Sequence, residues 1–184
     1  MLLRRWRAAD VDVLAAINAD PQVMEFFPAT LSGGQTAALI ERIEAAFQRR
    51  GYGLWALELP GEAELVGFAG LEDVHAALPC APAVEIGWRL DRAHWGRGLA
   101  SEAAACAARF AFSDAGLQAL VSTTSKANAR SRAVMERLGM TRDAAEDFEH
   151  PLLPSGHALA PHVLYRLSRE RWMTGAATAP RTPA

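Results

Sequence analysis

The sequence predicts an α/β fold of the α+β type, in which a mixed, mostly antiparallel sheet is flanked by helices. The chain has 184 residues, of which 51% are hydrophobic, and this suits one compact domain with a real core. Helical and strand patterns both occur, in the order strand, two helices, three strands, helix, strand, helix and two strands. This order lacks the regular alternation of a doubly wound sheet.

Each element follows from hydrophobic spacing and from the turn residues around it. Helical spacing is found at residues 10–18, 32–50, 99–116 and 128–138. Strand patterns are found at residues 2–6, 52–59, 65–74, 83–90, 117–124, 140–150 and 162–168. The strand at residues 83–90 alternates cleanly: its even-numbered residues are apolar and face one way, whereas Glu85, Gly87 and Arg89 face the other.

Capping residues mark several helix ends. Asp10, Ser32 and Asn128 each precede a helical pattern and carry a side-chain oxygen that can accept a hydrogen bond from a free backbone N–H group. Gly51 ends one helical pattern, and Gly139 lies where the C-terminus of a helix favours a left-handed residue. We therefore expect the helices to begin and end close to these residues.

Charge and composition exclude several classes of protein. The net charge is -2 and the pI is about 6.2, so no basic face for nucleic acid is expected. No segment is apolar enough to span a membrane, and the first residues lack a signal-peptide core. Cys80 and Cys106 form no disulfide framework, which indicates a reducing, cytoplasmic location. Residues 1–172 are expected to form the single domain, and residues 173–184, rich in small residues and proline, a disordered tail.

The stretch "HWGRGLASEAAA" joins the strand at residues 83–90 to an alanine-rich helix. A strand, a glycine turn and a helix start bring several free backbone N–H groups together at the positive end of a helix dipole. This arrangement suits a phosphate or pyrophosphate, although such a turn can also be a plain connection. The turn matches neither GxxxxGK[ST] nor GxGxxG, which disfavours nucleoside triphosphates and dinucleotides.

Three blocks together carry a family resemblance: "EIGWRL", then "WGRGLASEA", then "NARSRAVMERLGM". In this order and spacing they resemble the GNAT superfamily of acetyl-CoA-dependent N-acetyltransferases, and most of all the branch that includes the ribosomal-protein N-terminal acetyltransferases (RimJ/RimL-like). The resemblance covers nearly the whole chain. It implies a sheet whose central strands, residues 83–90 and 117–124, splay apart to admit the pantetheine arm of acetyl-CoA, with no metal involved.

The resemblance also implies which residues bind acetyl-CoA. The family's pyrophosphate loop, Gln/Arg-x-x-Gly-x-Gly/Ala, aligns with residues 95–100, where Trp95 replaces the usual Gln or Arg. The backbone around Trp88 to Leu90 would pair with the pantetheine amides. The full set of expected cofactor-binding residues is Trp88, Arg89, Leu90, Trp95, Gly96, Arg97, Gly98, Leu99, Ala100, Ser101, Asn128 and Arg132.

Acetyl transfer to an amine needs a base for the ammonium, a donor for the oxyanion and a proton for the departing thiolate. Glu85 is the candidate base, because Gly87 leaves space beside it and many members place a base in this strand. Ser131 is the candidate acid. Many members carry a tyrosine acid where this chain has Met135, which cannot donate a proton. A solvent-facing role for Glu85 and a helix-start role for Ser131 are the alternatives.

Three functions compete at this point. The first is direct transfer of the acetyl group to a primary amine, either a protein N-terminus or a small amine, in a ternary complex. The second is a catalytically silent acyl-CoA-binding module, favoured by Met135. The third is a metal-dependent hydrolase built on His150, His157 and His162. The sequence leaves the acceptor and the oligomeric state open, although the family includes many homodimers.

Overall fold

The computed structural model describes residues 1–176. The strands are β1 (Leu2–Arg4), β2 (Leu54–Leu59), β3 (Ala63–Asp73), β4 (Val84–Leu90), β5 (Ala119–Ser125), β6 (Thr141–Arg142), β7 (Phe148–Glu149) and β8 (Pro161–Ser168). The helices are α1 (Asp10–Ala19), α2 (Gly33–Arg50), α3 (Leu99–Ser113), α4 (Ala129–Arg137) and α5 (Arg169–Ala176). Two single-turn 3₁₀ helices span Arg92–His94 and Ala144–Glu146.

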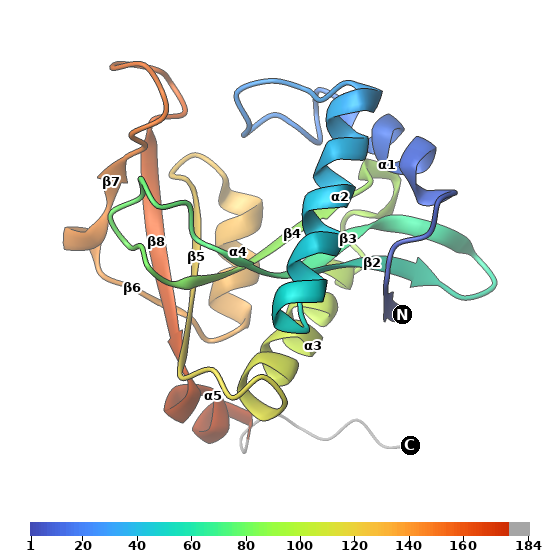
Figure 1. Ribbon diagram of the computed structural model, residues 1–184. Coiled ribbons are helices and arrows are strands. Elements are labelled where there is room, and N and C mark those ends of the chain that lie inside the picture. Colours follow the sequence, from blue (N-terminus) through green and yellow to red (C-terminus); the bar gives the residue numbers. More distant parts are fainter. Residues whose placement is uncertain (177–184) are drawn as a thin grey trace.

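All these strands join one sheet in the order β1-β2-β3-β4-β5-β8-β6, and β7 also pairs with β8 (Figure 1). Every strand pair is antiparallel except β4 and β5, which run parallel. This confirms the expected mixed, mostly antiparallel sheet. None of the helices within residues 1–176 is long and apolar enough to cross a membrane.

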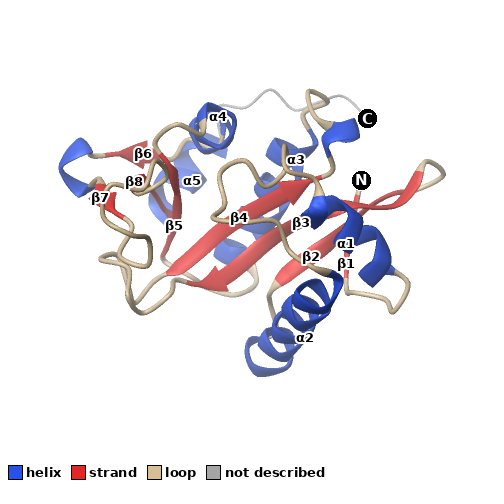
Figure 2. Cartoon of the chain, turned by 90° about the horizontal axis from the view of Figure 1, so that it is seen from above, coloured by secondary structure: helices blue, strands red, loops and turns tan. Residues whose placement is uncertain are grey.

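Helices cover both faces of the sheet. Figure 2 shows α1 and α2 on one side of β2–β4 and α3 on the other. Ile86 of β4 packs into a core cluster with the alanines of α3, whereas Phe68 of β3 packs with apolar residues of α1 and α2. The buried face of α3 consists largely of alanine, and small side chains let a helix lie close to a sheet. Glu85, Gly87 and Arg89 therefore face the α1–α2 side.

Local capping chemistry sets several helix ends as expected. Ser32 and Gln35 form a reciprocal capping box at the start of α2, and Gly51 ends that helix at φ 76°. Asn128 Oδ1 accepts from the backbone N–H of Ser131 at 3.1 Å at the start of α4. Gly139 follows α4 at φ 78°.

Asp10 departs from its predicted role as a helix cap. It is the first residue of α1, and its carboxylate is buried in a two-pronged contact with the guanidinium of Arg4, at 2.7 and 2.8 Å. It also accepts from the backbone N–H of Arg7 at 2.7 Å. A buried carboxylate is stabilised most by a cation with matching geometry, and this partner on β1 takes the place of the helix start.

The strand expected at residues 140–150 is broken into β6 and β7. Asp143 Oδ1 accepts from the backbone N–H of Ala145 at 2.9 Å and starts the short 3₁₀ helix between them. An ion pair between Arg142 and Asp147 closes the turn. A local side-chain bond of this kind competes with the strand ladder, which explains why the expected strand is interrupted.

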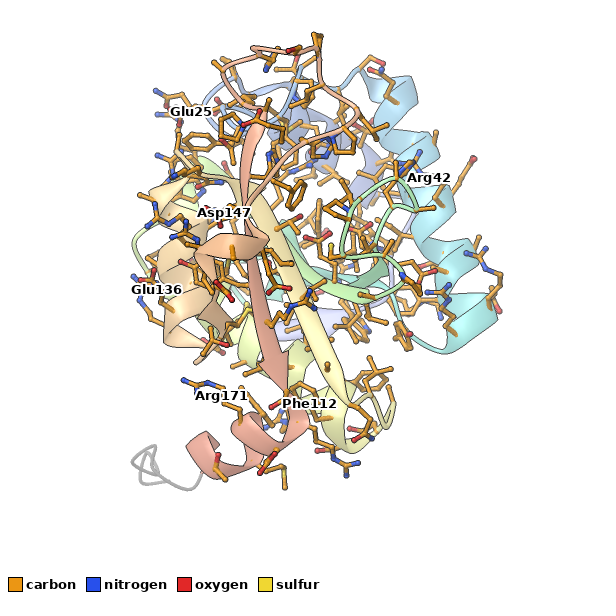
Figure 3. All side chains as sticks on the ribbon, turned by 90° about the vertical axis from the view of Figure 1, so that its left-hand side faces the viewer. Glu25, Arg42, Phe112, Glu136, Asp147 and Arg171 are labelled. Carbon is orange, nitrogen blue, oxygen red and sulfur yellow. The ribbon has the colours of Figure 1, made fainter. Side chains whose placement is uncertain are left out.

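Residues 173–176, which were expected to belong to a disordered tail, form the last turn of α5. Ser168 Oγ accepts from the backbone N–H of Arg171, and the ring of Trp172 lies 6.1 Å from that of Phe112. Arg171 Nε donates to the carbonyl of Gly139 at 2.5 Å, and Figure 3 shows Arg171 and Phe112 at the same end of the molecule. These tertiary contacts order the helix; residues 177–184 lie outside the described residues.

Candidate active site

The central strands β4 and β5 separate soon after they meet. Their only register pair is Glu85 with Val121, and beyond it the strands diverge into a V (Figure 1). Ser122 Oγ donates to the carbonyl of Ile86 at 2.9 Å, so this carbonyl points toward β5. Alternate residues of a strand direct their backbone groups to the same edge, so Trp88 directs its N–H and C=O into the V. The expected splay is therefore present.

A cavity of about 1070 Å³ occupies this opening and continues onto the α1–α2 side of the sheet. It gathers nearly all of the site residues expected from the sequence. Its wall includes Glu85, Trp88, Arg89, Leu90, Trp95, Gly96, Gly98, Leu99, Ala100, Ser101, Asn128 and Ser131. The exceptions are Arg97 and Arg132, which do not line it.

The glycine turn leads directly into α3. Gly96 has φ 75° and Gly98 has φ 79°, a left-handed backbone that side chains with a Cβ rarely adopt. Gly98 is the N-cap of α3, and no side chain of the described residues caps this helix start, in contrast to α2 and α4. The N–H groups of the first turn of α3 are therefore free to bind an anion at the positive end of the helix.

Trp95 and Arg97, the two large residues of this loop, each contact neighbouring groups. Trp95 Nε1 donates to the carbonyl of Leu90 at 3.0 Å, so that carbonyl already has a partner. The guanidinium of Arg130 lies 4.4 Å above the Trp95 ring. Arg97 turns outward and pairs with Glu62 of the β2–β3 turn. Trp95 thus braces the loop against β4.

Arg132 was expected at the cofactor site, but Arg137, for which no role was expected, lines the cavity instead. Arg132 Nη1 donates to the carbonyl of Lys126 at 3.1 Å, away from the cavity. Arg137, which sequence reasoning missed, lines the cavity and donates to Ser101 Oγ at 3.2 Å. Arg130 and Arg137 are two helical turns apart, and this spacing was the available signal that both lie on the cavity side of α4.

Glu85 reaches across from β4 to β5. Its Oε1 accepts from both the backbone N–H and the hydroxyl of Thr123, at 2.7 and 2.8 Å. Surrounding protein atoms raise the pKa of Glu85 to about 7; the Thr123 bonds oppose this and the charge of Glu72 adds to it. The side chain is only half-buried, because the cavity gives water access to it. Near neutral pH this carboxylate is therefore poised to accept a proton.

Ser131 lies on the opposite wall, in the first turn of α4. Asn128 Nδ2 donates to Ser131 Oγ at 3.1 Å and to Thr124 Oγ1 at 3.0 Å. Because Ser131 Oγ accepts this bond, its own proton stays available for a ligand. Asn128 has both N–H groups engaged, so its side chain positions Ser131 more than it contacts a ligand. Met135 is buried at 1% exposure and offers no proton.

The histidines form a pair, with His157 apart from it. The rings of His150 and His162 lie 4.7 Å apart on the cavity wall, and burial lowers the pKa of both. His157 does not line the cavity. Within residues 1–176, no group of three or more His, Cys, Asp or Glu side chains is arranged to hold a metal ion. The arrangement gives the hydrolase alternative no support.

Comparison with known proteins points to one family. The sequence model of the protein family described as "Acetyltransferase (GNAT) domain" matches residues 1–141. The chain is 32% identical over 130 residues to the FsC-acetyl coenzyme A-N(2)-transacetylase of Aspergillus fumigatus, covering 64% of this chain and 55% of that protein. The chain thus spans about half the length of this relative. A crystal structure of an acetyltransferase from Agrobacterium tumefaciens is 30% identical with a TM-score of 0.71, covering 90% of this chain and 88% of that one.

More distant structures share the fold alone. A ribosomal-protein-alanine N-acetyltransferase from Brucella melitensis is 17% identical, with a TM-score of 0.70 over 91% of this chain and 99% of that one. A spermidine N-acetyltransferase from Vibrio cholerae, in complex with CoA and spermine, is 14% identical, with a TM-score of 0.73 over 94% and 97%. The acceptors named for these two proteins differ, so likeness of fold leaves the acceptor of this chain undecided.

Proposed function

The chain belongs to the GNAT acetyltransferase family, and from this premise we propose that it moves an acetyl group from acetyl-CoA directly to a primary amine in a ternary complex. The V between β4 and β5 fits the pantetheine arm, because Trp88 directs backbone groups into it that resemble a strand edge. The uncapped start of α3 fits the pyrophosphate. Arg137 beside Ser101 adds positive charge at the same place.

Glu85 is the proposed base. An amine reaches the site mostly as an ammonium ion, which cannot attack until it loses a proton. A carboxylate with a pKa of about 7 accepts this proton far better than an ordinary glutamate, because its basicity is closer to that of the amine. Its place at the point where β4 and β5 separate is the single observation that carries the proposal.

Ser131 is the proposed acid on the opposite wall. Acetyl-CoA supplies the acetyl group as a thioester; one C–N bond forms and one C–S bond breaks. The ammonium loses two protons in total, of which Glu85 takes one and the other replaces the acetyl group on sulfur. Ser131 can pass that second proton, since Asn128 holds its oxygen and leaves its hydrogen free.

An acceptor screen tests the proposal. Purified chain is incubated with acetyl-CoA and N-terminal peptides, polyamines, aminoglycosides or amino-carboxylates, and free thiol is recorded. We expect turnover with at least one class, and a loss on the order of 100-fold at neutral pH in Glu85→Gln with acetyl-CoA binding retained. Binding of acetyl-CoA without turnover on any acceptor would instead establish the silent binding module.

The finer assignments rest on sequence alone. The motifs at residues 95–100 and 128–140 favour the branch that includes ribosomal-protein N-terminal acetyltransferases, and N-terminal peptides test this in the screen. A cytoplasmic location and a homodimer stay predictions. Sedimentation of the purified chain measures the second of these.

A further inference from the structure

The face of β3 and β4 that lies toward α1 and α2 forms the floor of the cavity, where the acceptor amine would bind. This floor carries charges of both signs. On this face Glu72 of β3 pairs in register with Glu85 of β4, and Gly70 pairs with Gly87 next to them. Glu72 Oε1 lies 3.9 Å from the position that a Cβ on Gly87 would occupy. The carboxylate of Glu72 therefore leans over the gap left by Gly87. Arg89 follows two residues further along the same face.

Apart from its charge, which adds to the raised pKa of Glu85, Glu72 has no role in the proposed mechanism, and its carboxylate has no bonded partner among the described residues. None of the residues in the described range 1–176 forms a hydrogen bond or an ion pair with its carboxylate, which is exposed on the cavity wall. Surrounding protein atoms raise its pKa, while the charges of Arg89 and Arg42 oppose this. Figure 3 shows Arg42 on α2. Its oxygens are free to accept hydrogen bonds from a ligand.

Arg89 is a cation with few bonds of its own. Among the described residues it donates one hydrogen bond, from Nη1 to Asn18 Oδ1 at 2.7 Å. Its guanidinium lies 4.2 Å from the ring centre of Phe27 and 5.1 Å from that of Phe68, and Nε is buried without a partner. Burial lowers its pKa to about 10, so it stays charged at neutral pH. A partly desolvated guanidinium in a cavity wall is stabilised by an anion.

We propose that the acceptor is an amphoteric molecule, whose amine is received by Glu72 and Glu85 and whose carboxylate or other anionic oxygen group is held by Arg89. This inference rests on the proposed transfer to an amine. The order of charges along the floor, two carboxylates and then a guanidinium, matches an ammonium followed by an anion. A second ammonium near Arg89 would be repelled, which disfavours diamines and polyamines.

Three acceptors of equal length separate these cases: 5-aminopentanoate, pentylamine and 1,5-diaminopentane. Thiol release gives kcat/KM for each, and calorimetry on the CoA complex gives the affinity for each without turnover. We expect the amino-carboxylate to exceed both amines at least tenfold in kcat/KM and in affinity. Equal or better use of pentylamine or of the diamine overturns the inference, even where acetyl transfer itself is established.

The variant Arg89→Gln provides a second test of this inference. Loss of the guanidinium should bring the ratio between 5-aminopentanoate and pentylamine close to one, whereas a purely structural role of Arg89 would lower both values together and keep the ratio. Arg89→Lys should keep part of the preference, since it keeps the charge and loses the planar fork. Arg5→Gln is the matched control, because Arg5 also lies over a phenylalanine ring but is outside the cavity, where it pairs with Glu44. A retained ratio in Arg89→Gln refutes the role of Arg89. If none of the three is acetylated, the affinities of the CoA complex still decide the inference.

Discussion

Replacement of Thr123 by valine tests how the structure sets the basicity of Glu85. The hydroxyl of Thr123 donates to Glu85 Oε1 at 2.8 Å, and the backbone N–H of the same residue donates at 2.7 Å. Valine removes the first bond and keeps the second. Both bonds favour the charged form, so the pKa of Glu85 should rise above its value of about 7.

The size of the effect follows from the strength of such a bond. A hydrogen bond to a charged group contributes about 1.5–3 kcal/mol, and the remaining N–H bond argues for the lower end. About 1.4 kcal/mol corresponds to one pKa unit, which moves the pKa of Glu85 to about 8. At pH 7 the charged fraction then falls from about one half to about one tenth, and kcat/KM falls roughly fivefold.

The assay is kcat/KM by thiol release between pH 6 and pH 9.5, expressed as the ratio of variant to wild type. This ratio cancels the titration of the acceptor amine. It should rise from about 0.1 at pH 6 to near one at pH 9.5, as both forms become fully charged. Thr123→Ser, which keeps the hydroxyl, should match wild type, and Thr141→Val is a control on β6 outside the cavity. A ratio that is constant with pH, or a pKa that falls, would refute this account of Glu85.

Three further substitutions have expected outcomes. Gly98→Ala places a side chain on a left-handed backbone, so it should lower the free energy of unfolding by about 1–2 kcal/mol in thermal melts and raise KM for acetyl-CoA. Gly33→Ala at the start of α2 should do neither. Ser131→Ala should lower kcat with little change in the affinity for acetyl-CoA; an unchanged kcat would assign the proton on sulfur to water. Asp10→Asn leaves Arg4 with a weakened partner, so the free energy of unfolding measured with denaturant should fall by on the order of 3 kcal/mol. Burial raises the pKa of Asp10, but the bonds from Arg4 and Arg7 lower it more, so the pKa lies below its ordinary value. The stability that charged Asp10 contributes to wild type should therefore be lost as the pH falls below the ordinary Asp range. Asp10→Asn should not show this loss.

The sequence by itself determined the class of fold, most element positions and the ends of several helices. Ser32 with Gln35, Gly51 and Asn128 act through hydrogen bonds and backbone preferences that span only a few residues, so their roles can be read locally. The glycine turn is local in the same sense. The blocks around it were enough to identify the family, and Glu85 stood out because its strand alternates so cleanly.

Tertiary structure alone decided how the site is charged. Thr123 lies 38 positions from Glu85, and the register of β3 and β4 places Glu72 opposite it, so neither neighbour could be inferred from local pattern. Arg97 is turned away by its ion pair with Glu62 on a distant turn, and Arg137 of α4 lies beside the start of α3. Burial and long-range Coulomb interactions depend on residues brought together only by folding. Hence the sequence could point to Glu85 and place Arg89 on the same face of its strand, but only the packing of three strands gives Glu85 a pKa near neutrality.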